Sequence, residues 1–186
     1  MSDLNHKLLV LAGPTAVGKG TVARYIIEHN PQVSLSVSAT TRSPRPGEID
    51  GVSYFFLTDA EFDELIETGQ MLEFAVVHGK HRYGTPKQPV EAALAEGKAV
   101  LLEIDIQGAR QVKERMPQAT TVFLAPPSWD ELVRRLEGRG TENPAEMALR
   151  LETAKIELAA QGEFDHVIVN DEVAKCAAAV VELMMS

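Results

Sequence analysis

The sequence predicts an α/β protein with a parallel sheet between two layers of helices, and three observations support this fold class. Five short apolar runs have strand character, and helical patterns separate them along the chain. A glycine-rich turn joins the first run to the first helix. Acidic residues appear only at the carboxyl end of the third run, where open parallel sheets bind ligands. The expected strands are 8–12, 35–39, 99–104, 120–125 and 166–169.

The composition fits a single folded domain. The chain has 186 residues, of which 45% are hydrophobic, enough for a packed core and too many for a disordered protein. The formal net charge of −9 argues against general nucleic-acid binding, which requires a basic surface. That charge still permits small phosphorylated ligands, because local arginines decide their binding.

Cysteine usage and hydropathy indicate the compartment. Cys176 is the only cysteine, so no disulfide forms within the chain, and its apolar helical setting predicts a buried free thiol. The first residues do not resemble a signal peptide, and no apolar run approaches the roughly 20 residues of a membrane span. We therefore expect a cytoplasmic protein with no membrane partner.

The turn after the first strand has the spacing G-x-x-x-x-G-K of a phosphate-binding loop. Its glycines allow successive backbone N–H groups to point at one anion, and the next helix directs its positive end there. A glycine-rich turn without a ligand is the alternative. Gly20 replaces the usual Mg²⁺-binding hydroxyl, so Thr21 is the nearest candidate metal ligand. The candidate phosphate contacts are Gly13, Pro14, Thr15, Ala16, Val17, Gly18, Lys19, Gly20 and Thr21.

The segment 34–86 reads as an insertion of short strands and one helix between two larger α/β halves. A proline-stiffened loop in it carries Arg42 and Arg45, which suit phosphate oxygens unless the loop is merely solvated. Alternation over 71–77 places Glu73 on the face opposite its larger apolar neighbours. Glu73 is then either a solvated edge residue or an acceptor inside a pocket.

Two further sets of polar residues suggest chemistry. Asp105 ends a buried strand and is either a magnesium-associated residue or the cap of the following helix. Arg135 and Arg150 lie on two expected helices, and Arg139 lies between two glycines in the turn that joins them. They can converge as a closing lid that brings charge to a transferring phosphoryl group, or they remain solvated surface arginines.

Several of these stretches together resemble the guanylate kinase family, whose members phosphorylate GMP. The resemblance spans nearly the whole chain. The phosphate loop alone is common to many activities, whereas the arginine loop and the Arg-Leu-x-Gly-Arg-Gly turn are far more specific. The matching stretches are 13–21, 36–45, 83–85, 104–108, 135–142 and 167–170.

The resemblance implies a P-loop kinase core with a small mixed α/β GMP-binding lobe inserted and a helical lid. It implies reversible transfer of the γ-phosphoryl group of ATP to GMP with Mg²⁺, within purine nucleotide metabolism. We expect a monomer or homodimer acting on these small substrates. The implied parts are a core at 1–33, 87–126 and 161–186, a GMP-binding lobe at 34–86, and a lid at about 127–160.

The resemblance also implies roles for individual residues. Glu103 stands where many relatives have Asp, and Thr21 and Asp105 are the candidate metal ligands. The implied catalytic residues are Lys19, Arg42, Arg135, Arg139 and Arg150. ATP would contact the loop 13–21 with Arg135, Arg139 and Asn170. GMP would contact Ser38, Arg42, Arg45, Tyr54, Glu73, Tyr83, Thr85, Glu103 and Asp105.

Base chemistry supports the guanine assignment independently. A carboxylate at Glu73 can accept from guanine N1–H and N2–H₂, and the Ser38 hydroxyl can donate to O6. Adenine reverses this edge and would leave an acceptor unpaired. The rival interpretations are a kinase for another monophosphate, a non-catalytic peptide-binding module of the same fold, and a simple GTPase, which would leave the inserted lobe unexplained.

The lid interpretation predicts the effect of one substitution. Arg139→Ala should retain most nucleotide affinity and lose turnover, because a lid arginine neutralises charge mainly in the transition state. Steady-state kinetics with both nucleotides measure this. An unchanged kcat would contradict a lid role for Arg139.

Overall fold

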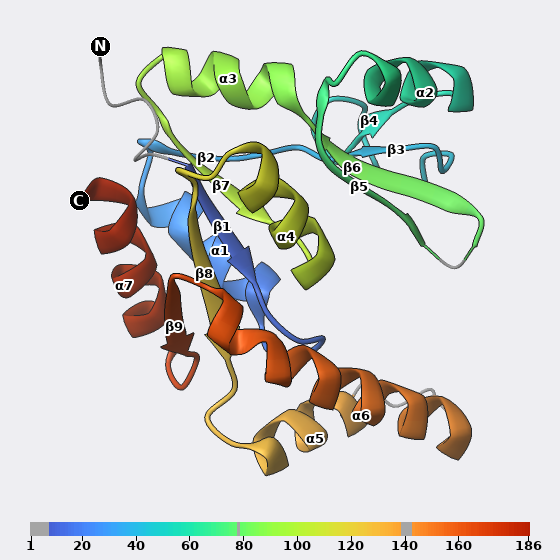
Figure 1. Ribbon diagram of the computed structural model, residues 1–186. Coiled ribbons are helices and arrows are strands. Elements are labelled where there is room, and N and C mark those ends of the chain that lie inside the picture. Colours follow the sequence, from blue (N-terminus) through green and yellow to red (C-terminus); the bar gives the residue numbers. More distant parts are fainter. Residues whose placement is uncertain (1–7, 78, 139–142) are drawn as a thin grey trace.

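The computed structural model describes residues 8–77, 79–138 and 143–186 and contains two sheets (Figure 1). The larger sheet has five strands in the order β2-β7-β1-β8-β9, and every neighbouring pair is parallel. β1 lies at its centre, as expected for the strand that leads into the phosphate loop. The strands are β1 (Leu8–Ala12), β2 (Val33–Leu35), β7 (Ala99–Glu103), β8 (Thr120–Ala125) and β9 (His166–Val169).

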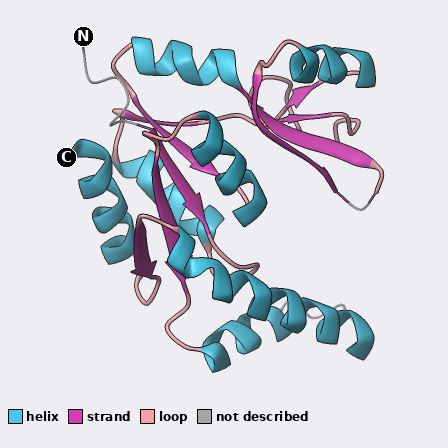
Figure 2. Cartoon of the chain, viewed as in Figure 1, coloured by secondary structure: helices cyan, strands magenta, loops and turns pink. Residues whose placement is uncertain are grey.

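Helices cover both faces of this sheet (Figure 2), which confirms the predicted three-layer class. The central strand β1 shows why, since Leu8 and Val10 pack on one side and Leu9 and Leu11 on the other. Buried on both faces, it reads as a continuous apolar run. The first side is covered by α3 (Lys87–Ala95) and α4 (Ile106–Arg115), the second by α1 (Lys19–His29) and α7 (Val173–Met185).

The second sheet is mixed, with the order β4-β3-β6-β5. The helix α2 (Asp59–Glu67) packs Phe62 against it, and a capping box of Thr58 and Glu61 begins the helix. The strands are β3 (Ala39–Thr40), β4 (Phe55–Phe56), β5 (Met71–Val77) and β6 (His81–Pro86).

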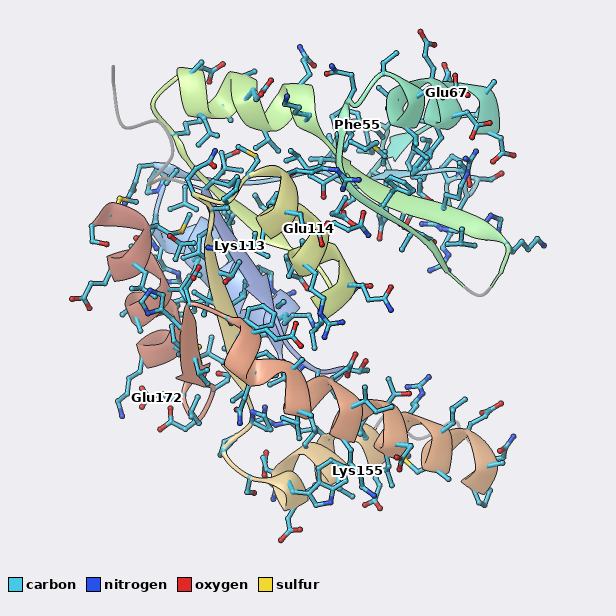
Figure 3. All side chains as sticks on the ribbon, viewed as in Figure 1. Phe55, Glu67, Lys113, Glu114, Lys155 and Glu172 are labelled. Carbon is cyan, nitrogen blue, oxygen red and sulfur yellow. The ribbon has the colours of Figure 1, made fainter. Side chains whose placement is uncertain are left out.

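The helices α5 (Trp129–Glu137) and α6 (Pro144–Ala159) form a pair at the bottom of Figure 1, followed by the short helix η2 (Ala160–Glu163). Ser128 and Asn143 cap their amino ends by accepting backbone hydrogen bonds. Lys155 of α6 reaches across the pair, with Nζ 5.9 Å from the centroid of the Trp129 ring (Figure 3).

The expected single strand at 35–39 is wrong in one respect, because the chain changes sheets within it. β2 ends at Leu35, and Ser36 N–H still donates to Leu101 of β7 at 3.0 Å. Two residues later Ser38 C=O accepts from Phe55 of the second sheet at 2.9 Å. The alternation is therefore real, but its two halves pair with different partners.

Side chains of α4 fasten the edge of the second sheet to the core. The Gln111 amide donates to Phe74 C=O at 2.9 Å and accepts from Phe74 N–H at 3.2 Å, replacing a missing neighbour strand. Arg115 Nη1 donates to Leu72 C=O at 2.8 Å. β5 is thereby held beside α4.

The expectation of a buried thiol is confirmed. Cys176 of α7 is buried, and burial raises its pKa to about 11, so the thiol stays protonated and unreactive at neutral pH. None of the helices described for residues 8–186 is both long and apolar enough to cross a membrane.

The fastening of β5 predicts a stability change. Gln111→Ala should lower the free energy of unfolding by about 1–3 kcal/mol, because both backbone groups of Phe74 lose their partner in a partly buried place. Urea denaturation measures this, with the exposed Gln107→Ala on the same helix as control. Equal stability of the two variants would contradict the bridging role.

Candidate active site

The loop between β1 and α1 wraps tightly because two of its glycines have no room for a side chain. A Cβ built on Gly13 would lie 2.4 Å from the Leu124 carbonyl oxygen, and one on Gly18 would lie 2.8 Å from Asn170 Nδ2. Gly18 also has a φ of +99°, which favours glycine. The glycine spacing of the motif is therefore fixed by β8 and by Asn170, which follows β9.

Lys19 and Asn170 complete the loop. Lys19 Nζ donates to Gly13 C=O at 2.7 Å and to Pro14 C=O at 3.3 Å, which places its charge over the loop. Asn170 is buried, and its Nδ2 donates to Val17 C=O at 2.9 Å. Asn170 thus supports the loop backbone directly.

A pocket of about 450 Å³ opens beside the loop. It brings together Thr21, Arg135 and Asn170, three of the residues predicted to serve one nucleotide. Arg135 lies close to the loop, since its Nη1 donates to Val17 C=O at 3.1 Å while its Nε pairs with Glu131. The pocket is lined by Ala16, Gly18, Thr21, Arg135, Gly138, Asn170, Asp171 and Val173.

Two carboxylates, Glu103 and Asp105, lie at the carboxyl end of β7. Glu103 Oε1 would lie 3.6 Å from a Cβ on Gly20, so Glu103 stands beside the phosphate loop. Asp105 Oδ1 accepts from Gly108 N–H at 2.6 Å, so Asp105 caps α4, and its predicted association with magnesium stays a prediction. Thr21 is exposed at the first turn of α1. Among the described residues, no group of three or more His, Cys, Asp or Glu is placed to hold a metal.

A second cluster forms where β3 meets β6. Arg42 Nε donates to the Tyr83 hydroxyl at 3.2 Å, and its guanidinium carbon lies 5.4 Å from the centroid of the Tyr54 ring. The two tyrosine rings meet edge to face at 5.9 Å. Arg42, Tyr54 and Tyr83, three of the residues implied to contact GMP, are therefore together. Arg45 is exposed, and its backbone N–H points into the same loop.

Glu48 is a residue of this cluster that the sequence analysis did not identify. Its carboxylate accepts two hydrogen bonds of 2.9 Å from Arg42 and one of 2.7 Å from Arg45 N–H. These bonds lower the pKa of Glu48 to about 2, and the same pairing raises the pKa of Arg42. The bidentate pair shows that the Arg42 fork takes a planar oxyanion here. The sequence offered one indication of this role, because Glu48 closely follows two arginines in a proline-stiffened loop.

Glu73 is buried and not a solvated edge residue. Only 7% of it is exposed, and the Thr85 hydroxyl donates to its Oε1 at 2.7 Å across the β5–β6 pair. Burial raises the pKa of Glu73 to about 7 despite that hydrogen bond, and the charge of Asp105 adds to the rise. An irregularity between Met71 and Glu73 breaks the expected alternation, so Leu72 and Glu73 are both buried.

Gly108 is the point where the Glu73 carboxylate meets α4. A Cβ built on Gly108 would lie 3.0 Å from Glu73 Oε2 and 3.2 Å from Asp105 Oδ1. The two carboxylates therefore converge on a backbone that has no side chain. The β3–β6 register pairs Ala39 with Gly84, so Ser38 precedes and Thr85 follows this pair in the chain.

The lid residues are placed in part. Arg135 reaches the phosphate loop, and Arg150 is half-buried on α6. Arg139 lies outside the described residues. The convergence of all three arginines stays a prediction.

Comparisons with known proteins agree with this geometry. The family model described as guanylate kinase matches residues 5–186. The guanylate kinase of Leifsonia xyli subsp. xyli is 66% identical over 178 residues, covering 96% of this chain and 70% of the relative. That of Nocardia farcinica is 60% identical over 181 residues, covering 97% and 94%.

A solved structure supports the same assignment. The crystal structure of guanylate kinase from Anaplasma phagocytophilum superposes with a TM-score of 0.73 at 33% identity, covering 96% of this chain and 84% of that chain. The match extends over the main sheet, the inserted lobe and the helix pair, because it covers almost the whole chain. The chain belongs to the guanylate kinase family of phosphotransferases.

Proposed function

We propose that this enzyme transfers the γ-phosphoryl group of ATP to GMP, reversibly, giving ADP and GDP. Membership of the guanylate kinase family supports the reaction. The observation that carries the choice of acceptor is the buried Glu73 carboxylate with Thr85 at its side. Guanine presents two adjacent donors, N1–H and N2–H₂, and a carboxylate accepts from both.

We assign ATP to the phosphate loop and the pocket beside it. The loop N–H groups and the amino end of α1 attract the phosphates, and Lys19 adds charge at the terminal ones. The pocket of about 450 Å³ has room for the nucleoside portion. This assignment agrees with Arg135 and Asn170 lining that pocket.

We assign the GMP phosphate to Arg42, Tyr54 and Tyr83, with Arg45 closing over it. The Arg42 guanidinium supports this assignment, because it already binds one planar oxyanion, the Glu48 carboxylate. The guanine edge is assigned to Glu73, Thr85 and Ser38. A base at Glu73 and a phosphate at Arg42 place the nucleotide along the second sheet, because β6 carries both Tyr83 and Thr85.

Catalysis requires positioning and charge neutralisation. A GMP phosphate oxygen attacks the γ-phosphorus in line, and this nucleophile is already an anion, so no dedicated general base is needed. Lys19, Arg42 and Arg135, with Arg139 and Arg150 from the lid, neutralise the developing charge. The proposed division into a core, a GMP-binding lobe at 34–86 and a lid at about 127–160 lets the two nucleotides bind separately before closure.

We also propose Mg²⁺ with ATP. Oxygen donors suit this ion, and the Thr21 hydroxyl, Glu103 and Asp105 lie around the start of α1 and the adjacent strand end. Because no three-carboxylate group is placed to hold a metal among the described residues, the phosphates and water supply the other ligands. Bound Mg²⁺ would neutralise charge on the β- and γ-phosphates.

The other candidate functions fit less well. AMP would present an acceptor to Glu73, and a peptide-binding module needs neither Lys19 nor the tight glycine loop. We propose a cytoplasmic enzyme of purine nucleotide metabolism, without a nucleic-acid or membrane partner, in accord with one buried cysteine and net charge of −9.

The test is ADP release with Mg-ATP and, separately, GMP, AMP, UMP and CMP. We expect turnover with GMP alone. Turnover with another monophosphate would keep the phosphate-loop assignment and overturn the guanine assignment. A folded protein that binds GMP and turns over none of the four would indicate a binding module.

The guanine contact proposed for Glu73 predicts a loss of catalytic efficiency with GMP. Glu73→Gln should lower kcat/KM for GMP by at least about 100-fold, because the amide turns an N–H₂ group toward the guanine donors. Glu67→Gln, on the exposed side of α2 (Figure 3), is the matched control. Equal kcat/KM values for the two variants would exclude guanine contact by Glu73.

The raised pKa of Glu73 predicts a pH dependence. Only the ionised carboxylate accepts from both guanine donors, so KM for GMP should rise as pH falls below about 7. The stability of the protein without GMP should change with pH in the opposite direction, because the folded state favours the neutral form of Glu73. The stability that Glu73 contributes is present below pH ~4.5 and is lost as pH rises through about 7.

A comparison with the Glu73→Gln protein isolates the titration of Glu73. The variant lacks the carboxyl group, whereas the titration of GMP itself is the same for both proteins. We expect the wild-type enzyme to show an additional loss of GMP affinity between pH 8 and pH 6, on the order of 10-fold, that the variant lacks. Calorimetric titration at several pH values measures it. Identical pH profiles of the two proteins would contradict a guanine–carboxylate contact.

A further inference from the structure

The lid helices hold the phosphate loop at three consecutive residues. Thr15 N–H donates to Glu157 Oε2 of α6 at 3.1 Å. Val17 C=O accepts from Arg135 Nη1 of α5 at 3.1 Å. Between them, Ala16 packs on an apolar cluster from both helices, formed by Trp129, Leu132, Leu136, Met147, Leu151, Ala154 and Leu158. The loop and the helix pair are therefore in direct contact through the Glu157 carboxylate, the Arg135 guanidinium and the apolar side chain of Ala16.

Packing alone does not explain a carboxylate at position 157. The apolar side chains of α6 already cover α5, and Glu157 stands beside them, half-buried. Burial disfavours its charge and raises its pKa, while Thr15 N–H and the nearby charge of Lys19 favour the ionised form. The groups that offset the cost of burying this carboxylate, Thr15 N–H and Lys19, therefore belong to the phosphate loop and not to α6.

Glu157 also shares a helix face with Arg150. The two residues are seven positions apart on α6, which is about two turns, so they project from nearly the same side. A contact that fixes Glu157 against the loop therefore fixes the rotation of α6 about its axis. That rotation determines where the Arg150 guanidinium lies relative to the phosphates.

We propose that Glu157 is a positioning residue, whose hydrogen bond to Thr15 N–H sets α6 on the phosphate loop so that Arg150 reaches the transferring phosphoryl group. This inference rests on the proposed function and adds a residue to it. Glu157 touches neither nucleotide in this role. Its effect passes through α6 to Arg150.

The test uses four variants of the full chain. Glu157→Gln keeps an oxygen acceptor without charge, Glu157→Asp keeps charge on a shorter side chain, and Glu157→Ala keeps neither. Glu152→Gln, on an exposed face of the same helix where Glu152 pairs with Lys155 at 3.6 Å, is the control. Melting temperature and GMP binding by calorimetry verify that each protein is folded with an intact acceptor site.

We expect kcat to fall about 10- to 100-fold for Glu157→Ala, since small misplacements of a catalytic group have effects of this size. KM for GMP should stay within about 3-fold, because the acceptor site is on the second sheet. Glu157→Gln should recover most of the activity and Glu157→Asp should not. The reverse order, with Asp active and Gln impaired, would overturn the hydrogen-bond role in favour of charge alone.

A double variant tests the path through Arg150. If Glu157 acts by placing Arg150, then Glu157→Ala should cost at most about 2-fold in kcat once Arg150→Ala is present. An equal loss in both backgrounds, or a Glu157→Ala enzyme as active as the Glu152→Gln control, would overturn the inference. These outcomes assume wild-type turnover with GMP, and absence of that turnover would refute the proposed function instead.

Discussion

The close approach of the phosphate loop to the strands beside it is the constraint on which the rest of the structure depends. Gly13 lies against the Leu124 carbonyl and Gly18 against Asn170, so β8 and the residue after β9 shape the loop. The carboxyl ends of β1, β7, β8 and β9 consequently deliver their polar residues to one edge of the sheet. Lys19, Glu103 and Asn170 meet there although they are far apart in sequence. The parallel order of strands thus builds the site that we propose for ATP.

The acceptor side is built by a different principle, the pairing of buried or shielded carboxylates. Glu48 holds the Arg42 fork in a bidentate geometry, and Glu73 accepts from Thr85 inside its pocket. Each carboxylate is matched by a donor that also suits the substrate, a guanidinium for phosphate or a hydroxyl beside guanine. Gln111 and Arg115 of α4 then fasten the second sheet to the core. The residues proposed for base selection and for phosphate binding are therefore joined by one small sheet.

Much of this could be predicted from the sequence because its signals are local. The apolar runs, the glycine spacing and the helix cap at Asp105 each depend on neighbouring residues. The features that were missed depend on contacts distant in sequence. The change of sheet within 36–38 and the irregularity before Glu73 follow from which strands pair. Glu157 touches a loop 142 positions away, and no local pattern on α6 indicates that contact.

The central claim is that ATP binds at the phosphate loop while GMP binds with its phosphate at Arg42 and its base at Glu73. A crystal structure with GMP and a non-hydrolysable ATP analogue tests it most directly. The account predicts guanine N1–H and N2–H₂ on Glu73 and the GMP phosphate on Arg42 and Tyr83. It also predicts the analogue's terminal phosphate over Lys19, in line with a GMP phosphate oxygen. A GMP base directed away from Glu73, or the analogue bound elsewhere than the loop 13–21, would contradict the account.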